Sequence, residues 1–486
     1  MEEQKMQQRQ SGQPDEKITR MGTGSIPKLI LEFAIPSVCG MMVNGAYNLI
    51  SAVFLGQALG ELGLAVATAA NPTMVIFMGL SMLVGMGGNA LCALRLGEGR
   101  KDLAERVLGN TVTLSFILWA VILFLAYCPW TIEFLLTLSS ATPEIRPYAK
   151  DFVQILSWGF VFQCIGAGVN NFIRTAGAPN RALLTMVIGA VSCTAFGFLF
   201  VMVFNWGVPG SALSTICGQL VSAITVVWYF TRTKNVPLRL TAPNMRFDAR
   251  TCGKIIVMGL ASFAVQLGAF VVGLVSNYVL VKYGALSPIG SDDALASIGV
   301  VQRIAMFSVL PIIGVSGAIQ PLLGFNYGAR NIARVRTTLA WGVGVATGIS
   351  VLFWLLVHLF ATQLVMLFGI TKPALAEFTV FALAVQLLML PIVGFQIVGS
   401  NYFQATGQPI KSTVLTLTRQ VIFLVPMYMV LPELMPVLLP QYTGLDAVYF
   451  ACPVADFLAI FTTAVFMALE LRRLKRIERG ELEVKI

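Results

Sequence analysis

Three ionisable residues stand inside long apolar stretches of the sequence: Arg303, Arg419 and Asp456. A charge at the centre of a bilayer costs at least about 2.5–3.5 kcal/mol, so such a residue normally faces a cavity or a partner. Two interpretations are open: an internal ion pair that holds helices together, or a role in binding a ligand or a proton. Asp456 is the best candidate for a proton carrier, although an arginine beside it would favour its charged form and oppose that role.

Uncharged polar residues also recur at helical spacing in these stretches. Asn44, Asn48 and Ser51 follow an i, i+4, i+7 pattern, which places them on one helix face. Amides turned toward lipid are unfavourable, so we expect these residues to line a cleft or to form hydrogen bonds between helices. The other candidates on such faces are Gln163, Asn170, Asn171 and Arg174; Gln266 and Asn277; Gln302, Ser316 and Gln320; and Gln386, Ser400 and Gln404.

Sequence patterns of enzymes are absent. No Gly-rich phosphate loop ending in Gly-Lys-Ser/Thr occurs, and no nucleophile with a nearby base is visible. The sole histidine, His358, cannot make a zinc site alone. The eight cysteines form no C-x-x-C pair and are interpreted as small core residues. We therefore expect neither an enzyme nor a bound metal.

The composition indicates a membrane protein. Mean hydropathy is +0.79 and 12% of the residues are charged, against roughly 25% in a soluble domain. The net charge of +10 comes from short segments between apolar runs, so we expect a lipid bilayer and no nucleic acid as partner. The polar N-terminal segment lacks the pattern of a cleaved signal peptide.

Uncharged runs of about 20 residues, the length that crosses a bilayer as a helix, recur along the chain. Asn205, Gly207 and Pro209 mark a turn that divides one longer run into two. We predict an all-α polytopic membrane protein of twelve helices, at residues 28–55, 63–92, 107–128, 149–172, 182–204, 209–231, 254–282, 295–325, 337–358, 375–401, 411–432 and 447–470.

The basic residues predict the orientation of these helices. With both termini in the cytoplasm, 27 of the 33 Lys and Arg lie in inside segments and four lie in outside segments. Arg303 and Arg419 are the other two. Positive residues favour the cytoplasmic side, so we expect a multi-pass protein of the inner (cytoplasmic) cell membrane with both termini inside.

The two halves of the sequence resemble each other. Residues 171–179 (NFIRTAGAP) match residues 401–409 (NYFQATGQP), and residues 97–100 match residues 327–330 at the same offset of 230. A duplicated six-helix unit gives two lobes related by a pseudo-two-fold axis along the membrane normal. The expected parts are a cytoplasmic tail (1–25), an N-terminal lobe (26–231), a linker (232–253), a C-terminal lobe (254–470) and a basic tail (471–486).

Several segments resemble the multidrug and toxic compound extrusion (MATE) family, and specifically its MepA-like branch. The resemblance implies two lobes around a V-shaped cleft and export of amphipathic, often cationic compounds, driven by inward flow of H⁺ or Na⁺. The segments span nearly the whole chain: AYNLISAVFLG (46–56), NNFIRTAGAPNRA (170–182), GVPGSALST (207–215), QPLLGFNYGARN (320–331), NYFQATGQP (401–409), TRQVIFLVP (418–426) and ACPVADFLA (451–459).

The chain departs from the family pattern at one expected cation site. The family's first helix reads Tyr-Asn-x-x-Asp, whereas here Tyr47 and Asn48 are followed by Ser51 at the position of the acid. In the fifth helix, Cys193 and Gly197 occupy the positions where the family often has Asn and Asp. The usual cation site of the first half is therefore expected to be missing.

We expect a secondary active exporter of small, amphipathic, cationic compounds that works as a drug:H⁺ or drug:Na⁺ antiporter by alternating access. No cofactor is expected besides the coupling ion, and the protein is expected to be a monomer. The alternatives are a lipid-intermediate flippase, an uncoupled uniporter, a rigid channel, and a non-transporting receptor or scaffold.

Overall fold

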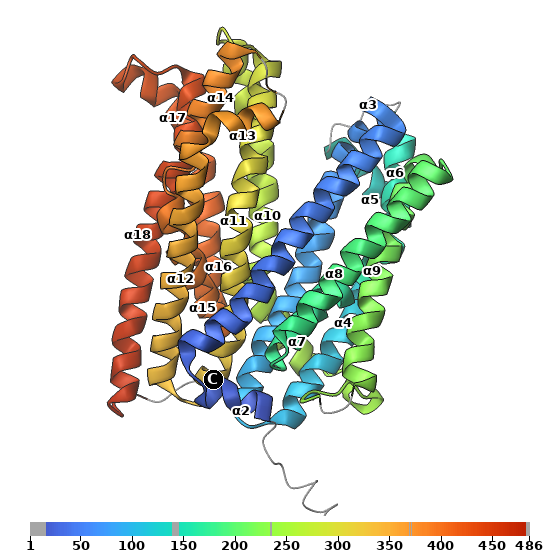
Figure 1. Ribbon diagram of the computed structural model, residues 1–486, viewed down its shortest axis with the longest axis vertical. Coiled ribbons are helices and arrows are strands. Elements are labelled where there is room, and N and C mark those ends of the chain that lie inside the picture. The colour runs from blue at the N-terminus through green and yellow to red at the C-terminus, as the bar shows by residue number, and fades with distance from the viewer. Residues whose placement is uncertain (1–15, 139–144, 234–235, 369, 371, 483–486) are drawn as a thin grey trace, which may run out of the picture.

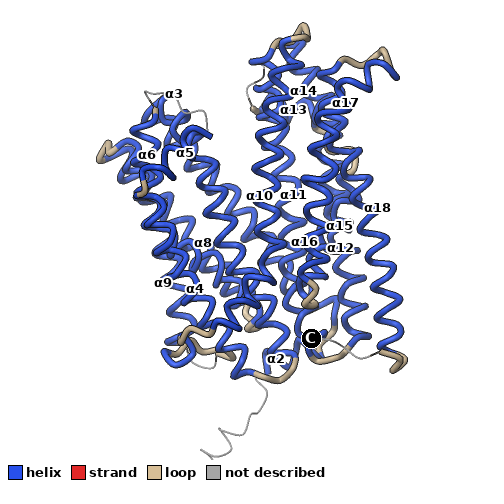
Figure 2. Tube along the Cα trace, turned by 180° about the vertical axis from the view of Figure 1, so that it is seen from behind, coloured by secondary structure: helices blue, strands red, loops and turns tan. Residues whose placement is uncertain are grey.

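The computed structural model describes residues 16–138, 145–233, 236–368, 370 and 372–482. The side chains of residues 16, 17, 47–65, 67–69, 135, 136, 138 and 292 lie outside this description. All regular secondary structure in the described residues is helical (Figure 2). Eleven of these helices are long and apolar enough to cross a membrane, or twelve spans when one bent pair counts as a span. The predicted all-α polytopic fold is confirmed.

The first half begins with a short helix, α2 (Glu16–Thr23), and the long helix α3 (Ile26–Gly97). A straight helix of 72 residues would be about 108 Å long. However, both ends of α3 lie beside the same turn of the second half, because Met21 and Gly97 each contact residues 325–326. The helix must therefore fold back, and Figure 1 shows it turning at the upper end of the molecule.

Two membrane spans lie within α3: an ascending span (Ile26–Ala46) and a descending span (Ala70–Gly97). The sequence predicts separate helices at 28–55 and 63–92, so the predicted break at 56–62 is wrong. That stretch contains no proline and several good helix formers, which let the backbone stay helical through the reversal.

The other helices of the first half follow the predicted ranges closely. The predicted turn after α8 is confirmed by positive φ angles at Asn205 and Gly207. The helices are α4 (Lys101–Tyr127), α5 (Pro129–Leu138), α6 (Arg146–Gln163), the π-helical segment Cys164–Val169, α7 (Asn170–Thr175), α8 (Pro179–Gly197), the π-helical segment Phe198–Val203 and α9 (Gly207–Arg232).

The second half repeats this plan. Its fourth span is broken by a bend of 44° between α14 and α15. The helices are α10 (Ala249–Ala285), α11 (Ser291–Gly328), α12 (Ile332–Leu359), α13 (Ala361–Leu367), α14 (Pro373–Gln386), α15 (Leu390–Ala405), α16 (Pro409–Leu417), the π-helical segment Thr418–Leu424, α17 (Val425–Leu438) and α18 (Gly444–Glu478).

Two short helices at the upper end are missed by the sequence prediction. α5 and α13 have ten and seven residues and stand at matching places in the two halves (Figure 1). A segment of that length is too short to cross a bilayer, so the search for spans passes over it.

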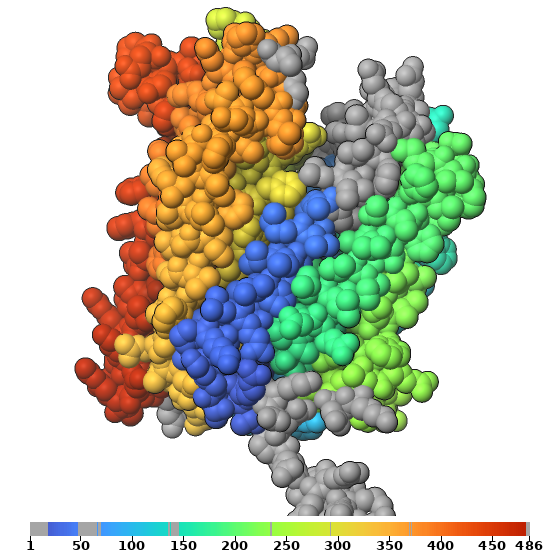
Figure 3. All heavy atoms as spheres, viewed as in Figure 1, coloured from blue at the N-terminus to red at the C-terminus, as the bar shows by residue number. Residues whose placement is uncertain are grey.

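The helices of the two halves lie close together at the lower end and diverge toward the upper end (Figure 1). Figure 3 shows side chains of the ascending part of α3 packed against the second half from the lower end upward. The predicted boundaries of the lobes, 26–231 and 254–470, stay a prediction.

The segment between the halves is fastened to the first half rather than free. Thr113 of α4 donates to the carbonyl of Met245 (2.7 Å), and the backbone N–H of Asp248 donates to Asn110 (2.8 Å). Asp248 then caps α10 by accepting from the N–H of Arg250. The hydroxyl of Thr251 donates to the Asp248 carboxylate and thereby lowers the pKa of that carboxyl from its ordinary value.

Candidate functional site

The two halves meet where α3 crosses α10 and α11, and we call this contact the lobe interface. Backbones approach closely there, because a Cβ atom at Gly259 of α10 would overlap the carbonyl oxygen of Leu83. A Cβ at Gly87 of α3 would overlap the carbonyl oxygen of Ile255. Small residues allow membrane helices to pack at this distance, so these glycines set the approach of the halves.

At the lower end the contact is reciprocal. A Cβ at Gly97 of α3 would overlap the carbonyl of Phe325, and a Cβ at Gly328 of α11 would overlap the carbonyl of Leu94. The two pairs exchange roles at an offset of 231, one position from the predicted 230. Contacts in which i touches j and the equivalent of j touches the equivalent of i are typical of a two-fold axis.

Higher up, the interface has two apolar contacts. Gly45 of the ascending span faces Phe307 and Leu310 of α11, and Gly79 of the descending span faces Phe263 and Gln266 of α10. Toward the upper end the helices of the two halves diverge (Figure 1). The contacts at Gly45 and Gly79 belong to the packed part of the interface.

A buried amide network joins the halves below that level. Asn89 of α3 donates to the side-chain oxygen of Gln320 on α11 (3.2 Å), and Thr175 donates to the oxygen of Asn89 (2.6 Å). The side-chain nitrogen of Gln320 is buried without a hydrogen-bond partner. Asn89 and Thr175 are missed by the sequence prediction, although an asparagine well inside a 28-residue apolar span is a usable signal.

The polar residues of helix α7 lie next to this network. Asn170 accepts a hydrogen bond from Thr185 (2.6 Å) and so binds α7 to α8 within the first half. Arg174 is buried and donates to the side-chain oxygen of Asn171 (2.9 Å). Its other terminal nitrogen lies 3.5 Å from the sulfur of Met186. No ion pair in the described part of the chain includes Arg174.

Two of the three predicted membrane-depth charges form an ion pair. The Nε atom of Arg419, in the π-helical segment before α17, donates to Oδ1 of Asp456 on α18 at 2.7 Å. The Asp456 side chain is 11% exposed and that of Arg419 is 28% exposed. The pair therefore links the fifth and sixth spans of the second half, and Arg303 stands apart from it.

Gln404 forms hydrogen bonds between helices of the second half. Its side-chain nitrogen donates to the carbonyl of Met258 (2.9 Å) and to Ser262 (2.9 Å), so it holds α15 to α10. Three residues earlier, Asn401 donates to the carbonyl of Ser316 on α11 (2.7 Å). These amides form hydrogen bonds between helices, which is one of the two roles predicted for the polar faces.

The remaining candidates differ in exposure. Gln302, Arg303 and Asn277 are exposed, whereas Asn44, Gln163 and Gln266 are half-buried. The side chains of Asn48 and Ser51 lie outside the described residues. The structure thus brings Arg419 to Asp456, and Asn171 to Arg174, and does not bring the candidates with described side chains into one cluster.

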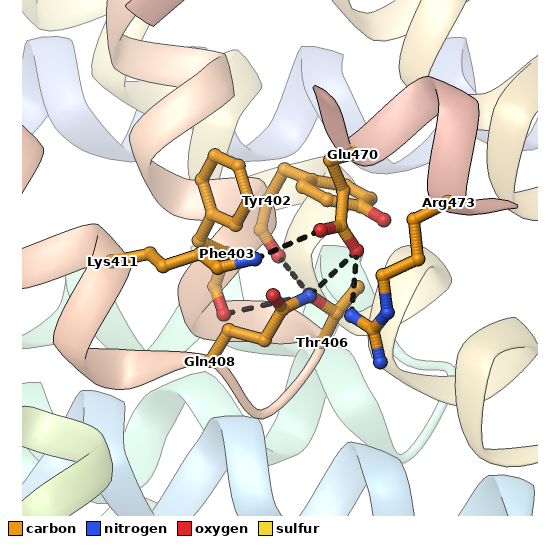
Figure 4. A network of polar contacts seen from close by, with 7 residues as sticks. All are labelled: Tyr402, Phe403, Thr406, Gln408, Lys411, Glu470 and Arg473. Atoms are coloured by element: carbon orange, nitrogen blue, oxygen red, sulfur yellow. Dashed lines mark hydrogen bonds and ion pairs between the residues drawn. The ribbon is translucent and has the colours of Figure 1, made fainter. Parts of the chain in front are cut away.

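The sequence prediction also misses a charged network at the lower end of the second half (Figure 4). Glu470 of α18 is 1% exposed and accepts from Lys411 (3.0 Å), Arg473 (3.0 Å) and Gln408 (2.8 Å). Sequence reasoning ends the last helix at 470, whereas α18 continues to Glu478. Because Glu470 stands at that predicted end, the sequence pattern gives no sign that it is buried.

A further set of hydrogen bonds joins the end of α2 and the start of α3 to the second half. Arg334 of α12 donates to the carbonyls of Gly24 (2.7 Å) and Met21 (3.3 Å), and to the side chain of Asn326 (3.2 Å). Asn326 also donates to the carbonyl of Met21 (3.1 Å). These hydrogen bonds lie at the lower end, where the two halves are in contact, and they hold α2 and the start of α3 to α11 and α12.

Chemistry other than binding finds no support at these sites. In the described part of the chain, no three His, Cys, Asp or Glu side chains gather as ligands for a metal ion. The described part of the interface offers hydrogen-bonding amides, an arginine (Arg174) without an ion pair among the described residues, and two packed contacts.

Known proteins share this sequence and architecture. The sequence profile of the MatE family matches residues 36–199 and 263–429. The multidrug export protein MepA of Staphylococcus haemolyticus is 24% identical over 475 residues, which cover 96% of this chain and 99% of that protein. A MepA of Staphylococcus aureus is 23% identical over 417 residues, which cover 84% and 88%.

Two solved structures have the same fold. One is a multidrug resistance MATE family transporter of the MOP superfamily in an outward-facing conformation, with a TM-score of 0.86, 23% identity and coverage of 96% of this chain and 100% of that chain. The other is a MOP superfamily transporter from Pyrococcus furiosus that is described as having a binding pocket of reverse polarity. Its TM-score is 0.85, its identity is 23% and the coverage is 96% and 100%. Since the family profile matches well over half of the residues, the chain belongs to the MatE family of membrane transporters.

Proposed function

We propose that the protein is a secondary active exporter of small amphipathic compounds that works by alternating access. The observation that carries this proposal is the lobe interface, where reciprocal contacts join the halves at one end while the helices diverge at the other. Rocking two such halves about a shared interface would close the upper end and open the lower end. The relatives described as multidrug export proteins support export as the direction.

The orientation follows from the basic residues. The lower end carries α2, the end of α18 and the Lys- and Arg-rich connections, so we place it in the cytoplasm. In this orientation the diverging upper end faces outward. The substrate would then be released from the state that the structure represents.

The Arg419–Asp456 pair is the proposed coupling element. Protonation of Asp456 would break the 2.7 Å contact with Arg419 and allow the helix of the fifth span to move relative to α18. In the structure, however, the carboxylate of Asp456 is already held by Arg419 as a structural partner. That contact favours the second candidate, an uncoupled uniporter driven by the charge of its substrate.

Transport into reconstituted vesicles tests both candidates. Purified protein in liposomes is given a fluorescent amphipathic dye together with a pH gradient, a Na⁺ gradient or a membrane potential, each applied alone. Antiport predicts accumulation driven by one ion gradient, and loss of that coupling in Asp456→Asn with dye binding retained. Accumulation driven by the potential alone indicates the uniporter, and no accumulation under any gradient refutes export.

A further inference from the structure

Arg303 lies on the face of α11 that is turned toward the first half. Four and seven positions further along this helix, Phe307 and Leu310 stand against Gly45 of the ascending span. Positions i, i+4 and i+7 share one face of a helix, so Arg303 lies on this face one turn nearer the upper end. The helices of the two halves diverge toward the upper end (Figure 1), the space-filling view is hollowed between the halves at that end (Figure 3), and Arg303 is exposed.

The guanidinium of Arg303 has no charged partner among the described side chains. None of the ion pairs among the described residues includes it. It lies twelve residues after Ser291, the first residue of α11, and hence about 18 Å below the upper end of the helix. A charge at this depth is unfavourable against lipid and normally faces a water-filled cavity. It shares a helix face with Phe307 and Leu310, which contact Gly45 of the first half, and it lies nearer the upper end than they do.

The same face of α11 meets a second arginine further down. A Cβ atom at Gly317, fourteen positions after Arg303, would lie 3.8 Å from a terminal nitrogen of Arg174. Arg174 is buried and also lacks an ion-pair partner among the described residues. The carboxylate of Asp456, by contrast, is bound to Arg419 inside the second half.

The described part of the lobe interface is therefore positively charged at two levels. Low-dielectric walls strengthen such a potential and raise the local concentration of anions. The first span carries Ser51 where the family pattern has an acid, so the sequence supplies no compensating charge at that position. A cationic compound would be repelled by this interface.

We propose that the space above the Gly45–Phe307 contact binds amphipathic organic anions, whose carboxylate or sulfonate is held by Arg303. The planar guanidinium donates two parallel hydrogen bonds to such a group, and the apolar part of the ligand packs on Phe307 and the exposed Met306. The inference rests on the proposed export function and names its substrate class. The class is opposite in charge to the cationic one that the family resemblance implies.

A pair of dyes with the same ring system and opposite charge tests this preference. Fluorescence anisotropy of the full-length protein in detergent is measured with carboxyfluorescein and with rhodamine 123. The wild type is expected to bind the anionic dye at least about tenfold more tightly. Arg303→Ala is expected to weaken that binding by roughly 10- to 100-fold, the loss typical of a charged hydrogen-bonded contact. Arg303→Lys should retain part of the affinity.

Lys282→Ala provides the matched control. It removes the same charge from the upper end of the second half, at an exposed residue that pairs with Glu433. Its affinity for carboxyfluorescein is expected to match that of the wild type. Charge reversal in Arg303→Glu should turn the preference toward rhodamine 123, a gain that misfolding does not produce.

Two results would overturn the inference. One is wild-type protein that binds rhodamine 123 as tightly as carboxyfluorescein or more tightly. The other is an unchanged affinity for carboxyfluorescein in Arg303→Ala. Because this assay measures binding without vesicles, its outcome is separate from export: a failure of both dyes to cross liposomes refutes the proposed function and leaves the charge preference measured.

Discussion

Arg334 is expected to hold the lower end of the protein closed. In the structure it donates to two backbone carbonyls at the start of the first half, Gly24 (2.7 Å) and Met21 (3.3 Å), and also binds Asn326 of its own half. Opening of the lower end by rocking would separate these groups. Arg334→Ala removes the contacts and should therefore favour the form that is open at the lower end.

The size of this shift follows from the hydrogen bonds lost. A hydrogen bond from a charged donor contributes about 1.5–3 kcal/mol when it is buried. Arg334 is half-buried and its longer contact is weak, so we assign about 2–3 kcal/mol to the pair of bonds. Each 1.4 kcal/mol is a factor of ten, which gives a change of roughly 30- to 150-fold in the equilibrium between the two forms.

Distance measurements between spin labels at the lower end check this prediction. Labels on the exposed positions Lys101 and Ala333, in a background without native cysteines, report the separation of the two halves. Arg334→Ala should show a longer distance population that is rare in the parent protein, and Arg334→Lys an intermediate one. Arg336→Ala is the control, since Arg336 pairs with Glu478 within the second half. An unchanged distribution in Arg334→Ala, or an equal shift in the control, would refute the reasoning.

Other consequences concern stability. Asp456→Asn leaves Arg419 unpaired at membrane depth and is expected to destabilise the protein by about 3–5 kcal/mol, whereas a double change of both residues to leucine should recover most of the loss; melting curves of the variants decide. Gly259→Ala should lower the melting temperature because its Cβ overlaps a backbone carbonyl of α3, while Gly253→Ala, on the same helix with nothing within 4 Å, should raise it slightly; equal melting temperatures would contradict the packing argument. Asp248 has a lowered pKa in the folded state, so its contribution is present above the ordinary pKa and is lost as the pH falls through the folded one. Asp248→Asn should thus melt earlier than the wild type at pH 7, and the difference should vanish in acid; a constant difference across this range would exclude the capping carboxylate as its source.

The membrane spans could be predicted from the sequence because lipid leaves few choices. A backbone in hydrocarbon must satisfy its own hydrogen bonds, so each long apolar run becomes a helix regardless of its neighbours. The turn at Asn205 and Gly207 was predictable for a similar local reason, since asparagine and glycine tolerate positive φ. The break predicted at 56–62 failed because nothing in that stretch forces the helix to end.

The partners of the polar residues could not be predicted in the same way. Asn89 and Gln320 are 231 positions apart, and their hydrogen bond exists only because α3 and α11 pack at one particular distance. The sequence left two interpretations of Arg419 and Asp456 open, and packing of the fifth span against the last one makes them an ion pair. For Arg303, only the packing of α11 against Gly45 shows that it shares a helix face with residues of the interface.

By itself, the sequence determined that this protein lies in lipid, that its two halves resemble each other, and that Ser51 stands where the family pattern has an acid. Composition, repeats and motifs are properties of the chain alone. Tertiary structure decided which arginines form ion pairs among the described residues and which helices pack against each other. The physical reason is that pairing depends on contacts of a few ångströms between helices far apart in sequence, and those contacts exist only after the two halves have packed.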